Sequence, residues 1–459
     1  MAVKGGPKII NDGLVLCLDA HDAKSYAGEP TTNFVYRETP RIDSSYSSYV
    51  YNSDSTWAAN HPDAIRVYNT DGTEISSYVN TGANSGNWQV IAHAHWVYDD
   101  ELRKPVVRMH RVAGYEGQWR ALSSSLNHTL SELGLTAGDK FTISWLQKAY
   151  VTGVYARAGL YMRNTSGSNN FWAGQATSSD VGQLSSELGK WAHKSKTFTV
   201  PSGMNETGFN VALYMYGQYS PTHLNEILIS DVQVETRDYA TPIVQGVSST
   251  NGYWGVRSAT NGWVDRSGNS NSGTLTNMIG TEVSHYRDGQ VIMPVANSYL
   301  NFDGSDDYVT VSATGTKTVE VWFNPDTTSG TNILYGPHTN GYDNWLSFST
   351  LVGLVGTESA DTNNFSIYGG SVSAGNWYQA VAIIDDTTAT LYVNGSQVAT
   401  TTKTFTIGSW SGKATIGRRG ALSQSYANAK IGLVKVYNRP LTATEVLQNY
   451  NATKGRFGL

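Results

Sequence analysis

Apolar and polar residues alternate with a period of two along most of this chain. Leu14, Leu16 and Leu18 fall on one face of a predicted first strand, because alternate residues of a strand point the same way. From residue 299 onward similar segments follow one another closely, as in YLNFDGSDDYVTV, TVEVWFNP and NWYQAVAIIDDTTATLYVNGSQVATT. Short strands at regular spacing are typical of a β-sandwich or jelly roll. We therefore predict an all-β chain of antiparallel sandwiches.

Two local signals stand out against this strand pattern. Asn394-Gly395 lies between two alternating segments and predicts a type I′ hairpin turn, which needs positive φ at both central residues. The segment LTATEVLQNYNATKG predicts a short C-terminal helix, in which Thr442 and Glu445 have the spacing of a capping box. Gly455 is expected to end this helix, which we expect to cover one edge of a sandwich.

Composition supports an all-β chain with more than one core. The chain has 459 residues, which predicts two or three domains. Only 15% of residues are charged, while the chain holds 28 Tyr and 13 Trp. Low charge with many aromatic residues favours pleated sheets and argues against disorder.

Charge, cysteine content and hydropathy exclude several classes of protein. The formal net charge is −5 and no run of Lys or Arg occurs, so we expect no nucleic-acid partner. Cys17 is the single cysteine, which excludes an intrachain disulfide, and its leucine-rich setting predicts a buried thiol. The first residues lack the apolar run of a secretory signal, and no segment reaches membrane-spanning length. We expect synthesis in a cytoplasm and no membrane insertion.

The C-terminal half carries a set of motifs that resembles a known family. They are DRSGNSNSGTLTN (Asp265–Asn277), FDGSDDYV (Phe302–Val309), NWYQA (Asn376–Ala380), LYVNG (Leu391–Gly395) and VKVYNRPLTATEVLQNYNATKGRFG (Val434–Gly458). Together with the first strand, this set resembles the laminin-G-like, concanavalin-A-like jelly rolls, in the version common in bacteriophage virion proteins. The resemblance covers the last two hundred or so residues and about the first thirty.

This distribution predicts that one domain is inserted into another. We expect residues 1–29 to supply the first strand of the laminin-G-like sandwich and residues 247–459 to supply the remainder. Residues 30–246 would then form a separate domain, and its segments TTNFV and ISDVQVETRDYATPIV resemble the first and last strands of a carbohydrate-binding-module type of jelly roll. If its two ends lie together the insertion costs little, because loop-closure entropy adds only about 0.6 kcal/mol per doubling of length. We assign no element to residues 41–87.

The sequence lacks the usual catalytic patterns of this sandwich. Glycosidases of the resembled fold use two carboxylates spaced E-x-D-x-E on one strand, and no such triplet occurs. Asp306 and Asp307 are adjacent, so we expect turn or strand-end residues, and Glu320 has no acidic neighbour two residues away. We therefore expect no enzyme activity, with a glycan-degrading enzyme as the alternative. His93 and His95 share one face of a strand, but without an evident third ligand a surface pair is favoured over a metal site.

The resemblance also implies structural calcium. Its ligands would be Asn33 and Asp231 in the inserted domain, and Asp303 with Asp306 or Asp307 in the laminin-G-like part. Family members commonly carry an acidic pair in the last strand motif, where this chain has Gly432 and Leu433. No other cofactor is expected.

Glycan binding would use exposed aromatic rings beside hydrogen-bonding side chains. Most aromatic residues of an all-β chain belong to the core, so we expect only some of the candidates to touch a ligand. The candidates in the insertion are Trp119, Tyr161, Phe171, Trp172, Tyr214 and Tyr216, and those in predicted loops of the C-terminal sandwich are Tyr342, Trp345 and Trp410.

These features together predict a non-enzymatic bacteriophage virion protein on the particle surface, as a tail-fibre, baseplate or head-decoration component. Its jelly rolls would bind host-surface glycans, and its partners would be other virion proteins. We expect a homo-oligomer, a trimer by analogy with phage fibres and decorations. The alternative is a purely structural cement or decoration protein of the capsid or tail, without a glycan ligand.

Overall fold

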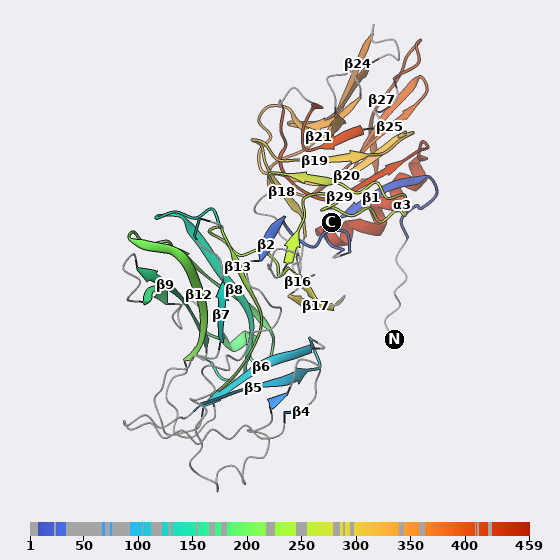
Figure 1. The fold of residues 1–459 in the computed structure, drawn as a ribbon. Coiled ribbons are helices and arrows are strands. Elements are labelled where there is room, and N and C mark those ends of the chain that lie inside the picture. The colour runs from blue at the N-terminus through green and yellow to red at the C-terminus, as the bar shows by residue number, and fades with distance from the viewer. Residues whose placement is uncertain are drawn as a thin grey trace, which may run out of the picture. The chain divides into compact units, whose positions relative to one another are not determined.

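The computed structural model describes a large part of the chain, in two compact units. It describes residues 8–22, 24–33, 67–68, 74–75, 92–102, 104–111, 122–126, 130–131, 133–152, 155–164, 170–175, 181–216, 225–244, 255–278, 285–287, 290–293, 298–338, 344–357, 363–408, 410, 413–420 and 425–459. One unit, here called the sandwich unit, comprises Met1–Pro30 and Arg257–Leu459, and the other, here called the module, comprises Thr31–Val256 (Figure 1). The prediction of an all-β chain with a C-terminal helix is confirmed.

The sandwich unit consists of two antiparallel sheets that face each other across one core. The first sheet has the order β1 (Leu14–Asp19), β29 (Asn428–Tyr437), β20 (Thr318–Pro325), β25 (Tyr378–Asp385), β26 (Thr388–Val393) and β27 (Ser396–Thr402), and β18 (Leu300–Asp303) also pairs with β29. The second sheet has the order β15 (Thr274–Thr276), β19 (Tyr308–Ser312), β28 (Lys413–Ile416), β21 (Asn332–Pro337), β22 (Trp345–Phe348), β23 (Leu351–Thr357) and β24 (Asn364–Ser371). A short hairpin of β16 (His285–Arg287) and β17 (Gln290–Met293) accompanies them.

The first strand of the chain lies in a sheet made by its last strands. β1 pairs with β29, with Leu16 opposite Val436 and Leu18 opposite Val434. Both leucines are fully buried in the core between the sheets. The unit is therefore closed by residues that are more than four hundred positions apart in sequence.

Side chains of the motif DRSGNSN form hydrogen bonds with backbone N–H and C=O groups on the outer edge of β1. The backbone N–H of Cys17 donates to Asp265 Oδ1 over 2.9 Å, and Asn271 Nδ2 donates to the carbonyl oxygen of Val15 over 2.8 Å. Ser267 Oγ donates to the same carbonyl oxygen over 3.0 Å. These side chains take the place of a further strand, so the exposed edge is not free to pair with another chain. The Cys17 thiol between them is buried, and burial raises its pKa to about 12.

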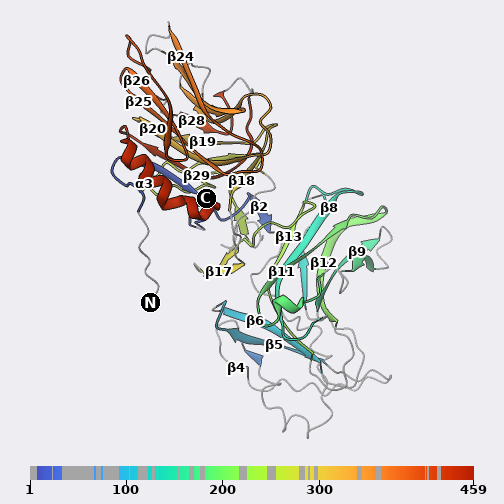
Figure 2. The same ribbon diagram turned by 180° about the vertical axis from the view of Figure 1, so that it is seen from behind.

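The C-terminal helix covers the outer face of the first sheet rather than its edge, where we predicted it. The helix α3 (Ala443–Thr453) begins after Thr442, whose hydroxyl accepts from the backbone N–H of Glu445. Val446 and Leu441 pack against Tyr437 and Ile383 on the face that points away from the main core. Figure 2 shows the helix α3 in front of the strands of this sheet. The helix packs there because an outer face lined with apolar residues has to be buried. The Arg439 guanidinium lowers the pKa of Glu445 to about 2 through two hydrogen bonds.

The last residues extend this cover. The helix ends at Thr453, just before the predicted Gly455, and the chain continues through that glycine as the 3-10 turn η5 (Lys454–Phe457). The Phe457 ring stacks on Trp322 with centroids 4.5 Å apart and lies 4.6 Å from Trp377. Arg456 forms an ion pair with Asp19 of β1 at 2.6 Å. The chain terminus thus ties the first strand to the sheet.

A buried ion pair joins the helix to the two central strands of this sheet. Lys435 Nζ lies 2.8 Å from Glu320 Oε1, and both side chains are 1% exposed. Glu320 also accepts hydrogen bonds from Gln379 on β25, over 3.0 Å, and from Asn449 on α3, over 2.8 Å. Buried charges are tolerated when they are paired and hydrogen-bonded, and the Glu320 carboxylate here accepts from three side chains of its surroundings besides Lys435.

The module has two antiparallel sheets of its own. One has the order β11 (Ala192–Thr199), β8 (Lys140–Ala149), β13 (Asn225–Glu235), β6 (Lys104–Arg111) and β5 (Ala92–Asp99), and the other has β10 (Asn170–Gln175), β9 (Tyr155–Asn164), β12 (Met204–Tyr216) and β7 (Leu122–Leu126). A two-stranded pair of β3 (Val67–Tyr68) with β4 (Glu74–Ile75) and a 3-10 turn η3 (Ser185–Glu187) complete the described elements. Buried Phe141, Trp145 and Phe198 belong to its own core.

The two ends of the module lie side by side. β2 (Thr31–Asn33), at its beginning, pairs with β14 (Gly255–Arg257), at its end. The buried Glu235 carboxylate, on the last long strand, accepts from Thr31 Oγ1 over 2.5 Å and from Thr241 Oγ1 over 2.7 Å. A domain with adjacent ends can be accommodated in a turn of another domain at small entropic cost. Among the described residues, no helix is long and apolar enough to cross a membrane.

Candidate functional site

The outer face of the second sheet carries a groove of about 690 Å³ above β21 to β24. Alternation along these strands directs Leu346, Leu354 and Ile367 into the core, where all three are buried. Their neighbours in sequence face outward, and the register sets Trp345 opposite Val355 on that outer face. The helix α3 covers the outer face of the first sheet. The groove lies on the outer face of the second sheet, which no described helix covers.

Tyr368 presents the largest exposed ring of the groove. Its side chain is 54% exposed, although it lies on the central part of β24. Gly353 lies opposite it on β23, and a Cβ atom at Gly353 would fall within 2.7 Å of two Tyr368 ring carbons. The glycine therefore lets the ring pack against the sheet backbone. Leu351, 37% exposed, extends the apolar surface along the same strand face.

Trp345 holds an arginine at the opposite part of the groove. The guanidinium carbon of Arg419 lies 3.9 Å from the centre of the Trp345 ring. The next residue back, Arg418, lies 3.4 Å above the Tyr308 ring, so both arginines of the IGRR segment are fixed on aromatic faces. Such cation–π contacts orient a guanidinium without using its N–H donors.

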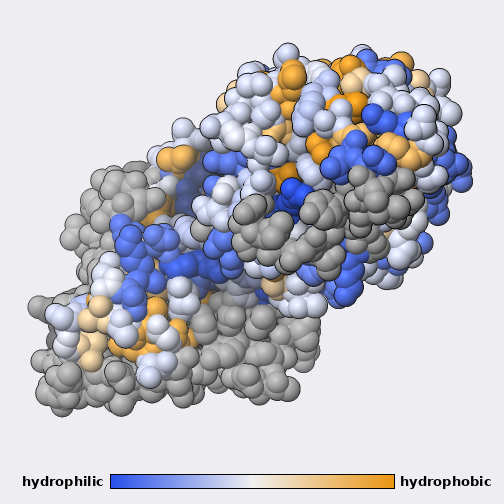
Figure 3. Space-filling model, turned by 90° about the horizontal axis from the view of Figure 1, so that it is seen from above, coloured by the Kyte–Doolittle hydropathy of each residue, from blue (hydrophilic) through white to orange (hydrophobic). Residues whose placement is uncertain are grey.

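The lining also contains polar and positively charged side chains. Ser366 and Asn364 are exposed on β24, while Lys403 and Arg419 are partly buried. Among the described residues that line the groove there is no Asp or Glu. The space-filling view shows apolar residues as separated patches among polar ones, without one continuous apolar face (Figure 3). The groove can thus offer a ring face, hydrogen bonds and two cations to a polar ligand.

The predicted sugar-binding residues of the C-terminal sandwich do not all lie at the groove. Trp345 lines the groove, but it starts strand β22 and is not in a loop as predicted. The prediction for Trp410 is wrong: this side chain is 4% exposed in the main core, with its ring centroid 5.5 Å from that of Tyr335. A covered indole has no face available to a sugar. Tyr342 lies outside the described residues.

In the module, the strand register brings four of the predicted aromatic residues to one face of a sheet. Tyr161 on β9 lies opposite Trp172 on β10, and the same Tyr161 lies opposite Asn210 on β12. Tyr214 and Tyr216 share the face of Asn210, because they follow it by even numbers of residues. Phe171 falls on the other face, opposite Met162. Trp119 lies outside the described residues.

The two histidines of HAHW lie on the edge strand β5. The register sets His93 opposite His110 of β6, and His95 opposite Arg108. His110, the other histidine nearby in the sequence, therefore occupies the register position beside His93.

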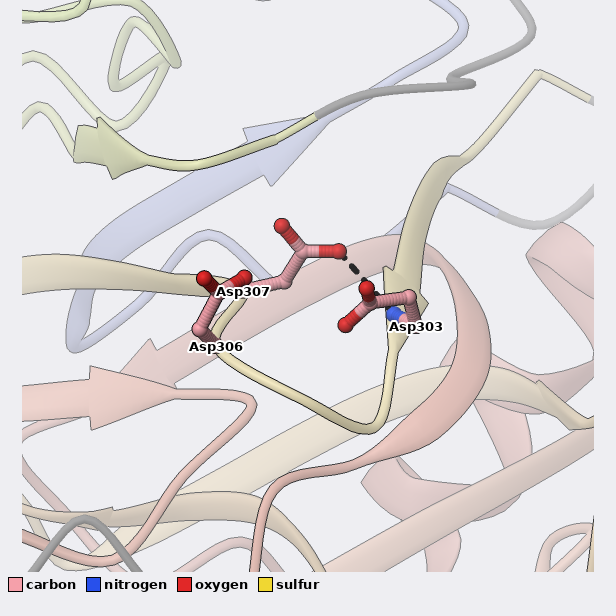
Figure 4. Close-up of side chains that lie close together, drawn as sticks. All are labelled: Asp303, Asp306 and Asp307. Atoms are coloured by element: carbon pink, nitrogen blue, oxygen red, sulfur yellow. Dashed lines mark hydrogen bonds between the residues drawn. The ribbon is translucent and has the colours of Figure 1, made fainter.

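Three aspartates come together in the turn between β18 and β19. These residues are Asp303, Asp306 and Asp307 (Figure 4). One carboxylate oxygen of each lies within 4.8 Å of one carboxylate oxygen of the other two. The turn, with Gly304 at φ 82°, brings the adjacent Asp306 and Asp307 to one site. The backbone N–H of Asp303 donates to Asp307 Oδ2 over 2.9 Å.

Asp307 has the features expected of a carboxylate that binds a cation. It is buried while Asp303 and Asp306 are exposed, and its Oδ1 has no hydrogen-bond partner. Burial raises the Asp307 pKa to about 7. Calcium prefers several carboxylate oxygens at one place, so these three residues fit the predicted ion and would hold it.

The second predicted calcium set is not assembled in the same way. Asp231 is buried at φ 50° in β13 and accepts from Ser230 Oγ over 2.9 Å. For Asn33 the structure describes only the backbone, in β2. The first and last strands of the module are instead joined by hydrogen bonds to Glu235, which the sequence reasoning did not single out.

Calcium should stabilise the protein through the Asp303 turn. A ligand at a hundred times its Kd adds about 2.7 kcal/mol, which raises Tm by roughly 5 °C or more in a unit of this size. We expect Asp307→Asn to abolish this rise in differential scanning calorimetry, because it removes the buried carboxylate.

Asp386→Asn is the matched control, since Asp386 is an exposed turn residue with φ 49° that asparagine also tolerates. A calcium-induced rise of equal size in Asp307→Asn and wild type would exclude this site. Absence of any rise in wild type at millimolar calcium would exclude the ion itself.

Comparison with known families gives one match within the sandwich unit. Residues 297–447 match the family described as the concanavalin A-like lectin/glucanases superfamily. The sandwich unit therefore has this fold, as the motifs predicted. No curated protein sequence matches the chain.

Solved structures with detectable similarity include receptor-binding domains of botulinum neurotoxins. The type G receptor-binding domain is 14% identical, with 41% of this chain and 47% of that chain covered and a TM-score of 0.32. The serotype D ligand-binding domain in complex with N-acetylneuraminic acid is 11% identical, with 41% and 47% covered and a TM-score of 0.32. A second serotype D structure is 10% identical, with 41% and 50% covered and a TM-score of 0.33. The match spans about half the length of these structures.

Proposed function

We propose that this chain is a non-enzymatic, glycan-binding protein that binds sugar in the groove above β21 to β24. The observation that carries the proposal is the Tyr368 ring, 54% exposed on a sheet face and backed by Gly353. Sugars bind through their C–H faces on aromatic rings and through hydrogen bonds to polar side chains. Ser366 and Asn364 beside Tyr368, and Arg419 on Trp345, supply such groups. The lectin-like fold of the sandwich unit supports the same conclusion.

The positions of the acidic side chains support binding rather than hydrolysis. Glycoside hydrolysis ordinarily needs two carboxylates on either side of the scissile bond. In the described part of the groove lining there is none. Glu320 is held in the buried pair with Lys435 on the other sheet, and the three aspartates cluster in the turn after β18.

We further propose that the protein is displayed on a bacteriophage particle, with other virion proteins as partners and as a homo-oligomer, for which we propose a trimer. The support is the resemblance of its motifs to phage virion proteins. Display in many copies would suit a weak site, because a millimolar Kd corresponds to only about −4 kcal/mol. Multivalency can add a factor of about 10² to 10⁴ in avidity. Antibody labelling of purified particles in the electron microscope tests this placement.

Tyr368→Ala should weaken glycan binding by about fivefold or more, because loss of one stacking ring removes roughly 1 to 3 kcal/mol. The measurement is binding of the multimerised full chain to an array of bacterial surface polysaccharides. Tyr150→Ala is the matched control, since Tyr150 in the module is equally exposed at 54%.

Equal binding by wild type and Tyr368→Ala would place the glycan outside the groove. Binding to no glycan would favour the alternative role of a structural cement or decoration protein. Shortened polysaccharide chains after incubation would show that the protein is an enzyme.

A further inference from the structure

We infer that the glycan bound in this groove is acidic and carries carboxylates, an inference that rests on the proposed function. Two cations line the groove, Arg419 and Lys403, and no described carboxylate lines it with them. The chain as a whole has a net charge of −5, so this positive charge is local to the groove. A ligand with negative charge would complement it.

Arg419 and Lys403 differ from six other cations of the sandwich unit in having no described ion-pair partner. Lys317, Lys430, Lys435, Arg266, Arg439 and Arg456 each lie within 4.0 Å of an acidic oxygen. For Arg419, the described contact is the face of Trp345. Among the described residues no hydrogen-bond acceptor is seen for its N–H donors, although the side chain is partly buried.

The Trp345 contact fixes the guanidinium before any ligand arrives. Stacking uses the flat face of the group and leaves its edge, which carries the donors, to face a ligand. The backbone behind it is also held, since Thr415 Oγ1 donates to the carbonyl oxygen of Arg418 over 2.8 Å and Arg418 lies on Tyr308. Pre-orientation lowers the entropy lost on binding.

A carboxylate is the anion that this arrangement suits. The planar fork of an arginine can donate two parallel hydrogen bonds to a carboxylate, and charge-assisted bonds of this kind are stronger than neutral ones. Lys403 supplies a second positive charge to the same groove. A sugar ring against Tyr368 with its carboxylate toward Arg419 would use all these groups, whereas a neutral sugar would leave both cations uncompensated. Uronic-acid and sialic-acid polymers are the matching class.

The test compares acidic polysaccharides with their own carboxyl-reduced forms, on the full-length protein. Polygalacturonate, hyaluronan and polysialic acid are suitable probes, because reduction of the carboxyl to a hydroxymethyl group keeps the ring and linkage. We expect at least one acidic polymer to bind about tenfold or more tightly than its reduced form in biolayer interferometry. We expect Arg419→Gln to lose that preference, and Arg419→Lys, which keeps the charge without the fork, to lose part of it.

Arg266→Gln is the charge-matched control, since Arg266 lies in the same unit on the exposed surface with Asp22. Equal binding of acidic and reduced polymers would overturn the inference and leave the proposed function standing. An unchanged acid preference in Arg419→Gln, or a preference for dextran sulfate over every carboxylate polymer, would also overturn it. Failure to bind any acidic, reduced or neutral polymer would contradict the proposed function itself.

Discussion

Joining Pro30 directly to Arg257, with residues 31–256 removed, should leave a sandwich that folds and melts cooperatively. The two residues already lie close together in the sandwich unit. The Arg257 guanidinium donates to the carbonyl oxygen of Ala27, over 3.1 Å, and to that of Glu29, the residue before Pro30. The joined chain keeps β1 in its place on β29. The measurement is calorimetric and near-ultraviolet circular-dichroism melting of the shortened protein.

Residues 257–459 alone should fail to fold. Without residues 1–30 the core loses Leu16 and Leu18 of β1 and also Tyr26, all fully buried. Each large apolar side chain contributes about 1.5 to 3 kcal/mol by burial, so the loss is comparable with the whole stability of a domain, about 5 to 15 kcal/mol. A cooperative transition in residues 257–459 similar to that of the joined chain would contradict the role given to β1.

Lys435→Met should destabilise the protein by about 3 to 5 kcal/mol, because it leaves the Glu320 carboxylate buried without its counter-charge. Glu320 would keep the hydrogen bonds from Gln379 and Asn449, but these donors carry no charge. The measurement is the free energy of unfolding from urea titration, followed by the fluorescence of the tryptophans.

Two further variants separate this effect from general loss of packing. Glu320→Gln combined with Lys435→Met removes both charges and should recover more than half of the lost stability. Lys317→Met removes a lysine whose partner Asp386 is exposed, and should cost less than about 1 kcal/mol. A Lys435→Met variant as stable as Lys317→Met would show that the buried pair is not needed.

Much of the sandwich could be predicted because its signals are local. The Asn394-Gly395 turn has φ of 50° and 76°, as a type I′ turn requires, and Thr442 caps α3 as the sequence spacing indicated. The alternation in Leu14–Asp19 correctly marked a strand, and the motif beginning at Asp265 is explained by its hydrogen bonds to that strand. These features depend on residues near one another or on a well-defined motif.

The groove could be predicted only in part, because it depends on which strands become neighbours. In NFSIYGGS, alternation with buried Phe365 and Ile367 directs Tyr368 outward, but only the register of β23 and β24 sets Gly353 beneath it. Arg419 was missed because it lies in the segment after β28, far in sequence from Trp345, and only the fold brings the two side chains together. Trp410 was misplaced because a loop aromatic can equally well close the core. Asp306 and Asp307 lie between β18 and β19, as turn or strand-end residues were expected to, but only the turn geometry reveals that they cluster with Asp303.

The open face of the second sheet is the proposed binding surface, and an acidic sugar is its proposed ligand. A crystal structure of the full chain soaked with an acidic oligosaccharide, chosen from the polymers that bind, tests this most directly. We predict a sugar ring against Tyr368 with its carboxylate on the Arg419 guanidinium. Sugar bound on the β9, β10 and β12 sheet of the module, with nothing above β21 to β24, would contradict it.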